Sequence, residues 1–202
     1  MLVAHLVPGY FAAVKSSSRW KLEWKTGQRA SLWAAALGST VVPDLDVIYN
    51  AVFRGFVNHS TLWTHSLFVH LSIALGWWLL RRIGRWPYVQ TFVGLIAVGG
   101  LSHLVLDVIS HGTPLLYPAS LVIFGFPPER VVEGDFWAYL TDPIFLLEPL
   151  LLTLAAVHWA LSRKPTQRVR ALTLIVLTGG LVSFGVAFLL LLPALQNAAA
   201  NL

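Results

Sequence analysis

The run VQTFVGLIAVGGLSHLVLDVI, at residues 89–109, contains a single acidic residue and no lysine or arginine. A helix needs roughly 18 to 20 apolar residues to cross the hydrocarbon core of a membrane, so this run predicts a membrane-spanning helix. The glycine pair Gly99–Gly100 inside it is expected to let neighbouring helices pack closely. Four apolar runs of this kind are unusual in a soluble protein, and the other three cover residues 62–80, 143–161 and 169–192.

The composition indicates the same class of protein. Of the 202 residues, 56% are hydrophobic and 11% are charged, whereas a soluble domain carries about a quarter charged residues. Two shorter apolar stretches, at residues 2–14 and 30–42, would each form a helix of roughly 20 Å, which is short of the hydrocarbon thickness. The predicted fold class is therefore all-α: a polytopic helical membrane protein with four long spans plus one or two short N-terminal apolar helices. We expect a single integral membrane domain over residues 1–202.

The basic residues gather in three segments, which predicts the orientation in the membrane. The formal net charge is +5, and twelve of the fourteen lysines and arginines lie within residues 15–29, 81–85 and 163–170. By the positive-inside rule these segments face the cytoplasm. All acidic residues except Glu23 then lie on the opposite side or nearer to it. The positive charge therefore reflects membrane orientation and does not indicate a nucleic-acid partner.

Histidines and aspartates gather on that opposite, extracytoplasmic face. His103 and Asp107 are four residues apart, so they lie on one face of a helix and can hold one cation. Asp44 and Asp46 are two apart, on the same side of a segment expected to be extended. The chain has no cysteine, so thiolate ligands are excluded. Imidazoles with carboxylates suit zinc, or else manganese or iron, and more than four ligands suit two or three ions. The set predicted on this face is His5, Asp44, Asp46, His59, His65, His103, Asp107, His111 and Asp142.

Structural roles are open for several of these residues. Asp142 precedes a proline and would be a good helix N-cap, and Asp44 and Asp46 could be turn residues. His70 is predicted to face away from the cluster. Glu148 lies inside a predicted span, where an ionised group usually has a function. For Glu148 a structural role and a role in supporting the metal ligands are equally open.

Four motifs occur in order along the chain: Pro43-Asp44-Leu45-Asp46, then His59 with Thr64-His65-Ser66, then Ser102-His103-Leu104-Val105-Leu106-Asp107, then Gly112-Thr113-Pro114-Leu115-Leu116-Tyr117-Pro118. In this order they resemble the bacterial and archaeal membrane-bound metal-dependent hydrolases of the YdjM and YbcI type. The motifs of that family look like P-D-x-D, H-R-G-x-T-H-S, S-H-x-x-x-D and G-x-P-L-x-x-P. The resemblance covers roughly residues 1–150, and the last span, residues 169–192, is generic. The family is distantly similar to zinc-dependent phospholipase C.

The resemblance implies a set of metal ligands and reveals one departure from the family pattern. The ligands that it implies first are Asp44, His59, His65, His103 and Asp107, followed by Asp46, His5, His111 and Asp142. The two histidines of the second motif are one residue further apart here, and the arginine between them is missing. If that arginine contacts a substrate phosphate, Arg54 or Arg130, the basic residues on the outer side, would replace it. Alternatively the activity is lost or changed.

The resemblance and the ligand set predict a metal-dependent hydrolase in the inner membrane of a prokaryote, with its metal site on the extracytoplasmic side. The expected reaction is hydrolysis of a phosphoester on a membrane lipid or lipid-linked substrate. Asp46 and Asp107 are the predicted catalytic residues, with Asp46 orienting the attacking water. The alternative is a metal-binding membrane protein for transport, sensing or assembly, without hydrolytic activity. A transporter would place ionisable residues along a whole path, whereas here they gather at one end. The oligomeric state is left open.

Overall fold

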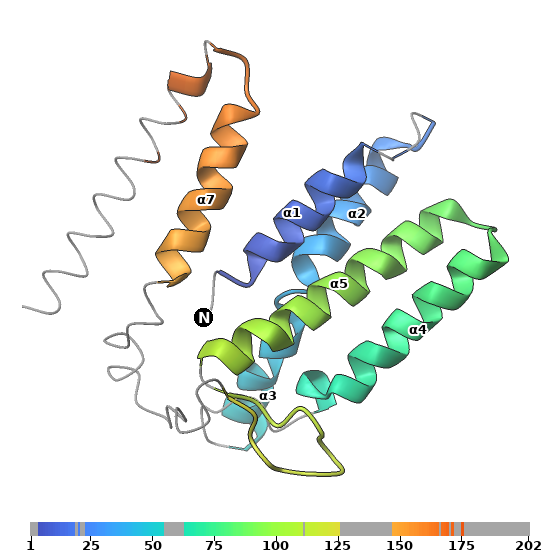
Figure 1. The fold of residues 1–202 in the computed structure, drawn as a ribbon, viewed down its shortest axis with the longest axis vertical. Coiled ribbons are helices and arrows are strands. Elements are labelled where there is room, and N and C mark those ends of the chain that lie inside the picture. Colours follow the sequence, from blue (N-terminus) through green and yellow to red (C-terminus); the bar gives the residue numbers. More distant parts are fainter. Residues whose placement is uncertain are drawn as a thin grey trace, which may run out of the picture. The chain divides into compact units, whose positions relative to one another are not determined.

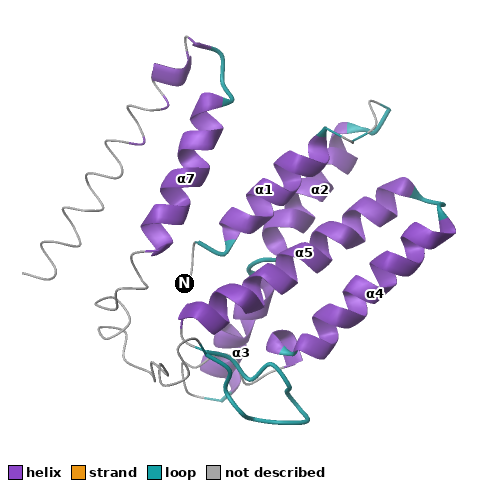
Figure 2. Cartoon of the chain, in the orientation of Figure 1, coloured by secondary structure: helices purple, strands orange, loops and turns teal. Residues whose placement is uncertain are grey.

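The computed structural model describes residues 4–18, 20, 23–54, 63–110, 112–125, 147–165, 167–169, 171 and 175. Over these residues every regular element is a helix (Figure 1, Figure 2). The one pairing of extended backbone among them is an isolated bridge between Thr113 and Phe124. The predicted all-α class is confirmed.

Two short helices are followed by a segment of tight turns, a long helical hairpin and a last described helix (Figure 1). In chain order the elements are α1 (Leu6–Ser17), α2 (Thr26–Gly38), the 3₁₀ turn η1 (Val42–Asp44), α3 (Leu45–Phe53), the 3₁₀ turn η2 (Trp63–His65), α4 (Leu67–Ile83), α5 (Pro87–Ser110) and α7 (Leu147–Leu161). The chain divides into two compact units, Met1–Glu148 and Pro149–Leu202. In the first unit α5 packs against α1, α2 and α4, so it is the central helix.

The prediction of four long membrane spans is wrong for the described residues, in which one helix is long and apolar enough to cross a membrane. That helix is α5, with 24 residues. The run at residues 62–80 includes η2 and then Ser66 in extended backbone, so α4 has only 17 residues. The run at 143–161 contains α7, with 15 residues, and most of the run at 169–192 lies outside the described residues. Hydropathy measures the length of an apolar run, but it does not show where turns shorten the helix.

The two short N-terminal helices are confirmed. With 12 and 13 residues, α1 and α2 are roughly 18 and 20 Å long. The backbone N–H of Lys25 donates to the side chain of Gln28 at 2.9 Å, a capping contact that starts α2 ahead of the apolar stretch. These two helices pack on α5 through a small apolar core of Ala13, Leu32, Ala36 and Leu95.

The Gly99–Gly100 pair is a place where α5 comes very close to its neighbours, as predicted. A Cβ added at Gly99 would collide with the side chain of Ser39, at the end of α2. A Cβ added at Gly100 would collide with the ring of His70 on α4. The Ser39 hydroxyl also donates to the carbonyl of Leu95 on α5, at 3.3 Å. Small residues here therefore hold α2 and α4 against the same part of α5.

Gly99→Ala should destabilise the protein by about 1–3 kcal/mol, because the new methyl group overpacks the contact with Ser39. Gly76→Ala on α4 is the matched control, since a Cβ there meets no other atom within 4 Å and alanine favours a helix. Thermal unfolding of both variants in detergent checks this prediction. If Gly99→Ala unfolded at the same temperature as the unchanged protein, the close approach of α5 to Ser39 would be refuted.

The hinge between α4 and α5 lies at the opposite end of this hairpin from the start of α4 and the end of α5 (Figure 1). Arg81 and Arg82 lie in the last turn of α4, beside the hinge. On α5, Asp107 follows Pro87 by 20 residues, which corresponds to roughly 30 Å. The hydrocarbon core of a membrane is about 30 Å thick. The arginine-rich hinge and the histidine–aspartate end of α5 therefore lie one membrane thickness apart.

Candidate metal centre

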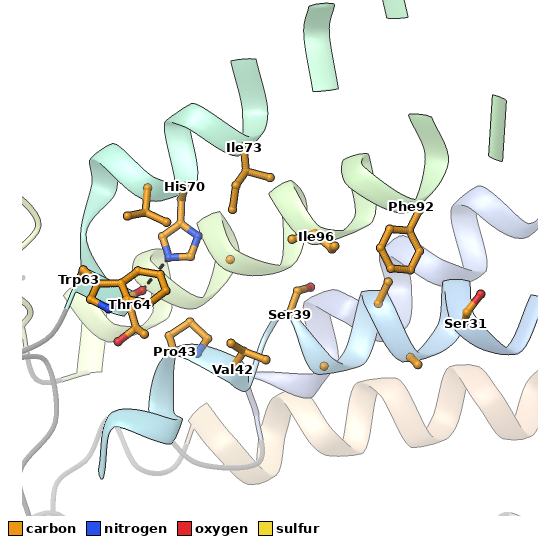
Figure 3. A pocket seen from close by; sticks show the side chains of 15 residues that line it. Ser31, Ser39, Val42, Pro43, Trp63, Thr64, His70, Ile73, Phe92 and Ile96 are labelled. Atoms are coloured by element: carbon orange, nitrogen blue, oxygen red, sulfur yellow. Dashed lines mark hydrogen bonds between the residues drawn. The ribbon is translucent and has the colours of Figure 1, made fainter. Parts of the chain in front are cut away.

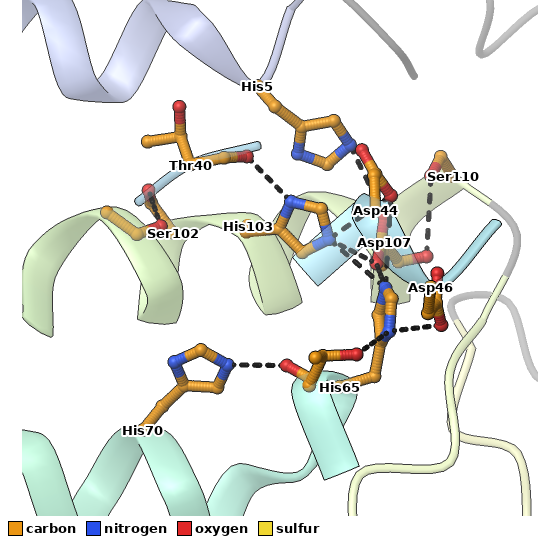
Figure 4. Close-up of polar contacts among 12 residues, drawn as sticks. His5, Thr40, Asp44, Asp46, His65, His70, Ser102, His103, Asp107 and Ser110 are labelled. Carbon is orange, nitrogen blue, oxygen red and sulfur yellow. Dashed lines mark hydrogen bonds and ion pairs between the residues drawn. The ribbon is translucent and has the colours of Figure 1, made fainter. Parts of the chain in front are cut away.

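Histidine and aspartate side chains from five segments meet at the end of α5 (Figure 4). They come from the residue before α1 and from η1, α3, η2 and α5: His5, Asp44, Asp46, His65, His103 and Asp107. All are almost completely buried except Asp44, whose side chain is 16% exposed. The convergence predicted from membrane topology is thus present for these six residues.

Four of the six side chains place a ligand atom around a common point. One such atom from each of Asp44, His65, His103 and Asp107 lies within 4.8 Å of the others. His103 Nε2 lies 3.0 Å from Asp107 Oδ2, 3.2 Å from His65 Nε2 and 3.6 Å from Asp44 Oδ1. His65 Nε2 lies 3.3 Å from Asp107 Oδ2 and 3.9 Å from Asp44 Oδ1.

Five of the six separations among these atoms are close to the edges of a tetrahedron around one metal ion, and the sixth, between Asp44 and Asp107, is within 4.8 Å. Zinc binds imidazole nitrogen and carboxylate oxygen at about 2.0–2.2 Å, so neighbouring ligand atoms in a tetrahedral site lie about 3.3–3.6 Å apart. The shortest and longest of the five separations, 3.0 and 3.9 Å, bracket that range. The neighbouring carboxylates of Asp44 and Asp107 also favour a positive charge nearby, which a metal ion or a protonated histidine can supply. The donor set and its spacing therefore suit one four-coordinate divalent ion.

His103 is oriented by a backbone carbonyl in the turn between α2 and η1. Its Nδ1 lies 2.8 Å from the carbonyl oxygen of Thr40, which can only accept a hydrogen bond. The proton therefore sits on Nδ1, and the lone pair on Nε2 points at the four-atom cluster. Metal-binding histidines are commonly held by such a contact at their other nitrogen. The ring of His5 stacks on the ring of His103, with the two ring centroids 4.1 Å apart.

Asp46 lies behind His65 rather than beside Asp44. Its Oδ2 is 3.1 Å from His65 Nδ1, the ring nitrogen that faces away from the four-atom cluster. The prediction of an extended segment is wrong here, because η1 ends at Asp44 and α3 begins at Leu45. Residues two positions apart in a helical turn are rotated by roughly 200° about the axis, so the side chains of Asp44 and Asp46 point to nearly opposite sides. Asp44 thus reaches the cluster directly, whereas Asp46 contacts it through an imidazole.

The carboxylates around His65, the last residue of η2, favour a positive charge on its imidazole. Burial by itself would lower the pKa of His65, but its contacts with the carboxylates of Asp107 and Asp46 outweigh this and raise the pKa to about 9. Burial raises the pKa of Asp44. Without a metal, His65 therefore holds a proton between carboxylates, and a metal that takes its Nε2 lone pair must displace a proton.

His5 approaches Asp107 from the side opposite His65. Its Nε2 lies 3.3 Å from Asp107 Oδ1, the oxygen that does not face His65 and His103. Burial lowers the pKa of His5, which favours the neutral, metal-binding form. His5 therefore contacts a candidate ligand from outside the four-atom cluster, to which it contributes no atom.

The remaining predicted site residues fall into two groups. Arg54 ends α3 on the surface, with its guanidinium 5.6 Å from the ring centre of Tyr49. Glu148 is buried and accepts a hydrogen bond from the backbone N–H of Ala4, the residue before His5, at 3.3 Å. Glu148 thus contacts the segment that carries a candidate ligand. The residues outside the described part of the chain, whose roles stay predictions, are His59, His111, Arg130 and Asp142.

Two supporting groups were missed by reasoning from the sequence. The Thr40 carbonyl belongs to the backbone, so no side-chain pattern signals it. His70 contributes no atom to the four-atom cluster, in line with its prediction, but it is buried and its Nε2 lies 2.8 Å from the carbonyl oxygen of Thr64. Because Thr64 immediately precedes His65, His70 holds the turn that carries a ligand (Figure 4).

Asp46→Asn is expected to weaken zinc binding by about 10- to 100-fold without abolishing it, as replacement of outer-shell partners does in other sites. The amide keeps the size of the side chain but loses the negative charge that holds His65 Nδ1–H. Asp44→Asn, which removes a carboxylate from the four-atom cluster, should weaken binding more. Zinc titrations of both variants check this order. The reverse order would contradict the assignment of Asp46 behind His65.

The fold and the site together define a class of protein: an all-helical chain whose membrane-length helix ends in a buried histidine–aspartate cluster that could hold a metal ion. The particular family follows from comparison with known proteins. The chain belongs to the YdjM family, since the family model described as YdjM inner membrane protein matches residues 1–192. This match confirms the resemblance to the YdjM type and supports a membrane location.

The match also corrects the expected extent of the resemblance. It continues past residue 150 to residue 192, so the last apolar run, expected to be generic, is part of it. No curated protein and no solved structure matches the chain. The distant similarity to zinc-dependent phospholipase C is not confirmed.

Proposed function

We propose that this protein is a membrane-embedded metal-dependent hydrolase that cleaves a phosphoester of a lipid-borne substrate at the extracytoplasmic interface. The observation that carries the proposal is the clustering of four ligand atoms, from Asp44, His65, His103 and Asp107, five of whose six separations are close to those of a tetrahedral site. Zinc is the proposed ion at these four residues. Such ions lower the pKa of bound water and stabilise the negative charge that develops on a phosphoryl group.

The chain's own residues have separable tasks in this proposal. Thr40 and Asp46 orient the imidazoles of His103 and His65, so that both lone pairs face the cluster. The 16% exposure of the Asp44 side chain is the largest among the six residues, so a substrate would approach on the Asp44 side. Asp107 would be a metal ligand, with Oδ2 toward His65 and His103 and Oδ1 toward His5. A basic residue for the substrate phosphate is the role proposed for Arg54 or Arg130.

The hairpin supports the proposed orientation. Arg81 lies over the ring of Trp77 and Arg82 over that of Trp78, at 5.4 and 5.0 Å. Pairs of tryptophan and arginine at a helix end are typical of a membrane interface on the cytoplasmic side. The metal centre, one membrane thickness away along α5, would then face the extracytoplasmic side.

Metal transport is the main alternative, and the composition of α5 argues against it. From Pro87 to Ser102 this helix carries no acidic residue, lysine, arginine or histidine. A transport path requires ionisable groups along its length, whereas the candidate ligands in the described part of the chain lie at one end of α5.

The test is the metal content and hydrolytic activity of the full-length protein purified in detergent. We expect bound zinc and chelator-sensitive hydrolysis of lipid phosphoesters, including phospholipid and polyprenyl phosphate substrates. Metal-free protein, or activity unchanged in His103→Ala, would refute the hydrolase. Metal uptake into proteoliposomes would favour transport. Tightly bound metal without any hydrolysis would favour a structural role.

A further inference from the structure

An apolar groove of about 520 Å³ lies between α2, α4 and α5 in the first unit (Figure 3). Its walls include Ala34 and Gly38 on α2, Ile73 on α4, and Phe92 and Ile96 on α5. The volume is within the range of roughly 300–1,000 Å³ found for small-molecule sites. The groove is therefore large enough to take a ligand rather than a few water molecules.

Two residues at one end of the groove are direct sequence neighbours of candidate metal ligands. Pro43 and Thr64 line the groove, and each is followed directly by a candidate ligand, Asp44 and His65. Along α5 the groove runs from Gly100 to Phe92, which are 7 and 15 residues before Asp107. At 1.5 Å per residue, the groove thus covers the part of α5 that lies roughly 10 to 22 Å from Asp107, toward the start of the helix.

The hydroxyl groups of Ser31 and Ser39 and one ring nitrogen of His70, in the groove walls, are engaged by the protein. The Ser31 hydroxyl bonds Tyr88 and the Gln28 carbonyl. The Ser39 hydroxyl donates to the carbonyls of Ala36 and Leu95. His70 uses Nε2 on the Thr64 carbonyl, and its Nδ1, buried against Gly100, has no hydrogen-bond partner among the described residues. The groove therefore offers a ligand hydrocarbon contacts and almost no hydrogen bonds.

We propose that this groove holds the hydrocarbon chain of the lipid whose phosphoester lies at the metal centre. The proposal rests on the proposed function, because it needs a headgroup at the four-atom cluster. The stretch between Gly100 and Phe92 is roughly 12 Å long, close to the depth of one leaflet, about half of a 30 Å core. A lipid with its headgroup at the centre would extend its chain in the direction of the groove.

Gly38 offers a substitution that fills the groove. It lines the groove, and a Cβ at this position meets no other atom within 4 Å. The Cβ of Gly38→Leu therefore enters open space, and its longer side chain is expected to occupy part of the groove. Gly76 on α4 has equally open space at its Cβ but is not a groove residue. Gly76→Leu is the matched control.

The test places a diazirine-bearing aliphatic amino acid at Ile96 of the full-length, metal-loaded protein in phosphatidylglycerol vesicles. The same amino acid at Leu75, which is 56% exposed on α4, reports contact with bulk lipid. We expect lipid adducts at Ile96 that fall on the order of tenfold in Gly38→Leu, as when a few methylene groups lose their burial. Gly76→Leu should leave them unchanged, and adducts at Leu75 should not respond to either substitution.

Two outcomes would overturn the groove assignment. The first is an equal yield of lipid adducts at Ile96 with and without Gly38→Leu. The second is cross-linking of Ile96 to another segment of this chain or to a second copy instead of lipid, since either would be the occupant in place of a lipid chain.

Hydrolysis measured on the same samples separates this proposal from the proposed function. Gly38→Leu should lower the rate for phosphatidylglycerol relative to the rate for bis(p-nitrophenyl) phosphate, a water-soluble phosphoester without a hydrocarbon chain. An unchanged ratio in an active enzyme would refute the groove and leave the hydrolase standing. If neither compound is hydrolysed, the hydrolase fails for these substrates, and the cross-linking alone decides whether the groove holds a lipid chain.

Discussion

His103→Ala should lower the affinity for zinc by more than about 100-fold, because even groups that only support a ligand are worth 10- to 100-fold. The imidazole is completely buried, and its Nε2 lies within 3.6 Å of ligand atoms from three other residues. Nothing else on this turn of α5 can supply a nitrogen at that point. Zinc content after purification and a zinc titration measure the effect.

Two comparisons keep this result interpretable. His158→Ala removes an exposed histidine from α7 and should leave zinc binding unchanged. His103→Gln keeps a polar side chain that can still donate to the Thr40 carbonyl, so it should fold even if the alanine variant does not. A folded His103→Gln or His103→Ala protein with unchanged zinc content would show that the cluster is not the metal site.

Removing the metal should destabilise the protein strongly. A ligand present at 100 times its dissociation constant stabilises the folded state by about 2.7 kcal/mol if it does not bind the unfolded chain. For a chain of about 200 residues this corresponds to a thermal shift on the order of 5–10 °C. The shift should be large here because the four candidate ligands come from three separate elements, η1, η2 and α5.

Thermal unfolding with zinc, with chelator, and with zinc restored measures the shift. In His103→Ala the three curves should coincide, since the variant has no tight site from which zinc could be removed. A chelator effect of equal size in that variant would place the stabilising metal elsewhere in the chain. No chelator effect in the unchanged protein would leave the cluster as a hydrogen-bonded network without an ion.

Much of the site could be predicted because its strongest element is local. His103 and Asp107 are one helical turn apart, so their alignment follows from helix geometry once α5 is recognised as an apolar helix. Arg81 and Arg82 lie in the last turn of α4, at the end of the hairpin away from His103, as the sequence predicted. The predicted start of a span at residue 62 was wrong, because Leu62 and Trp63 extend the apolar run although η2 and Ser66 form the turn that presents His65.

Residue types, their spacing along α5 and the end of the molecule at which they gather follow from the amino-acid order alone, since they depend on helix periodicity and charge distribution. Which atom faces which was decided by the tertiary structure. A helical rather than extended backbone sends Asp44 into the cluster and Asp46 behind His65. The tautomer of His103 depends on the carbonyl of Thr40, 63 residues away in the chain. A backbone acceptor has no side-chain signature, and its position depends on how α2 packs against α5.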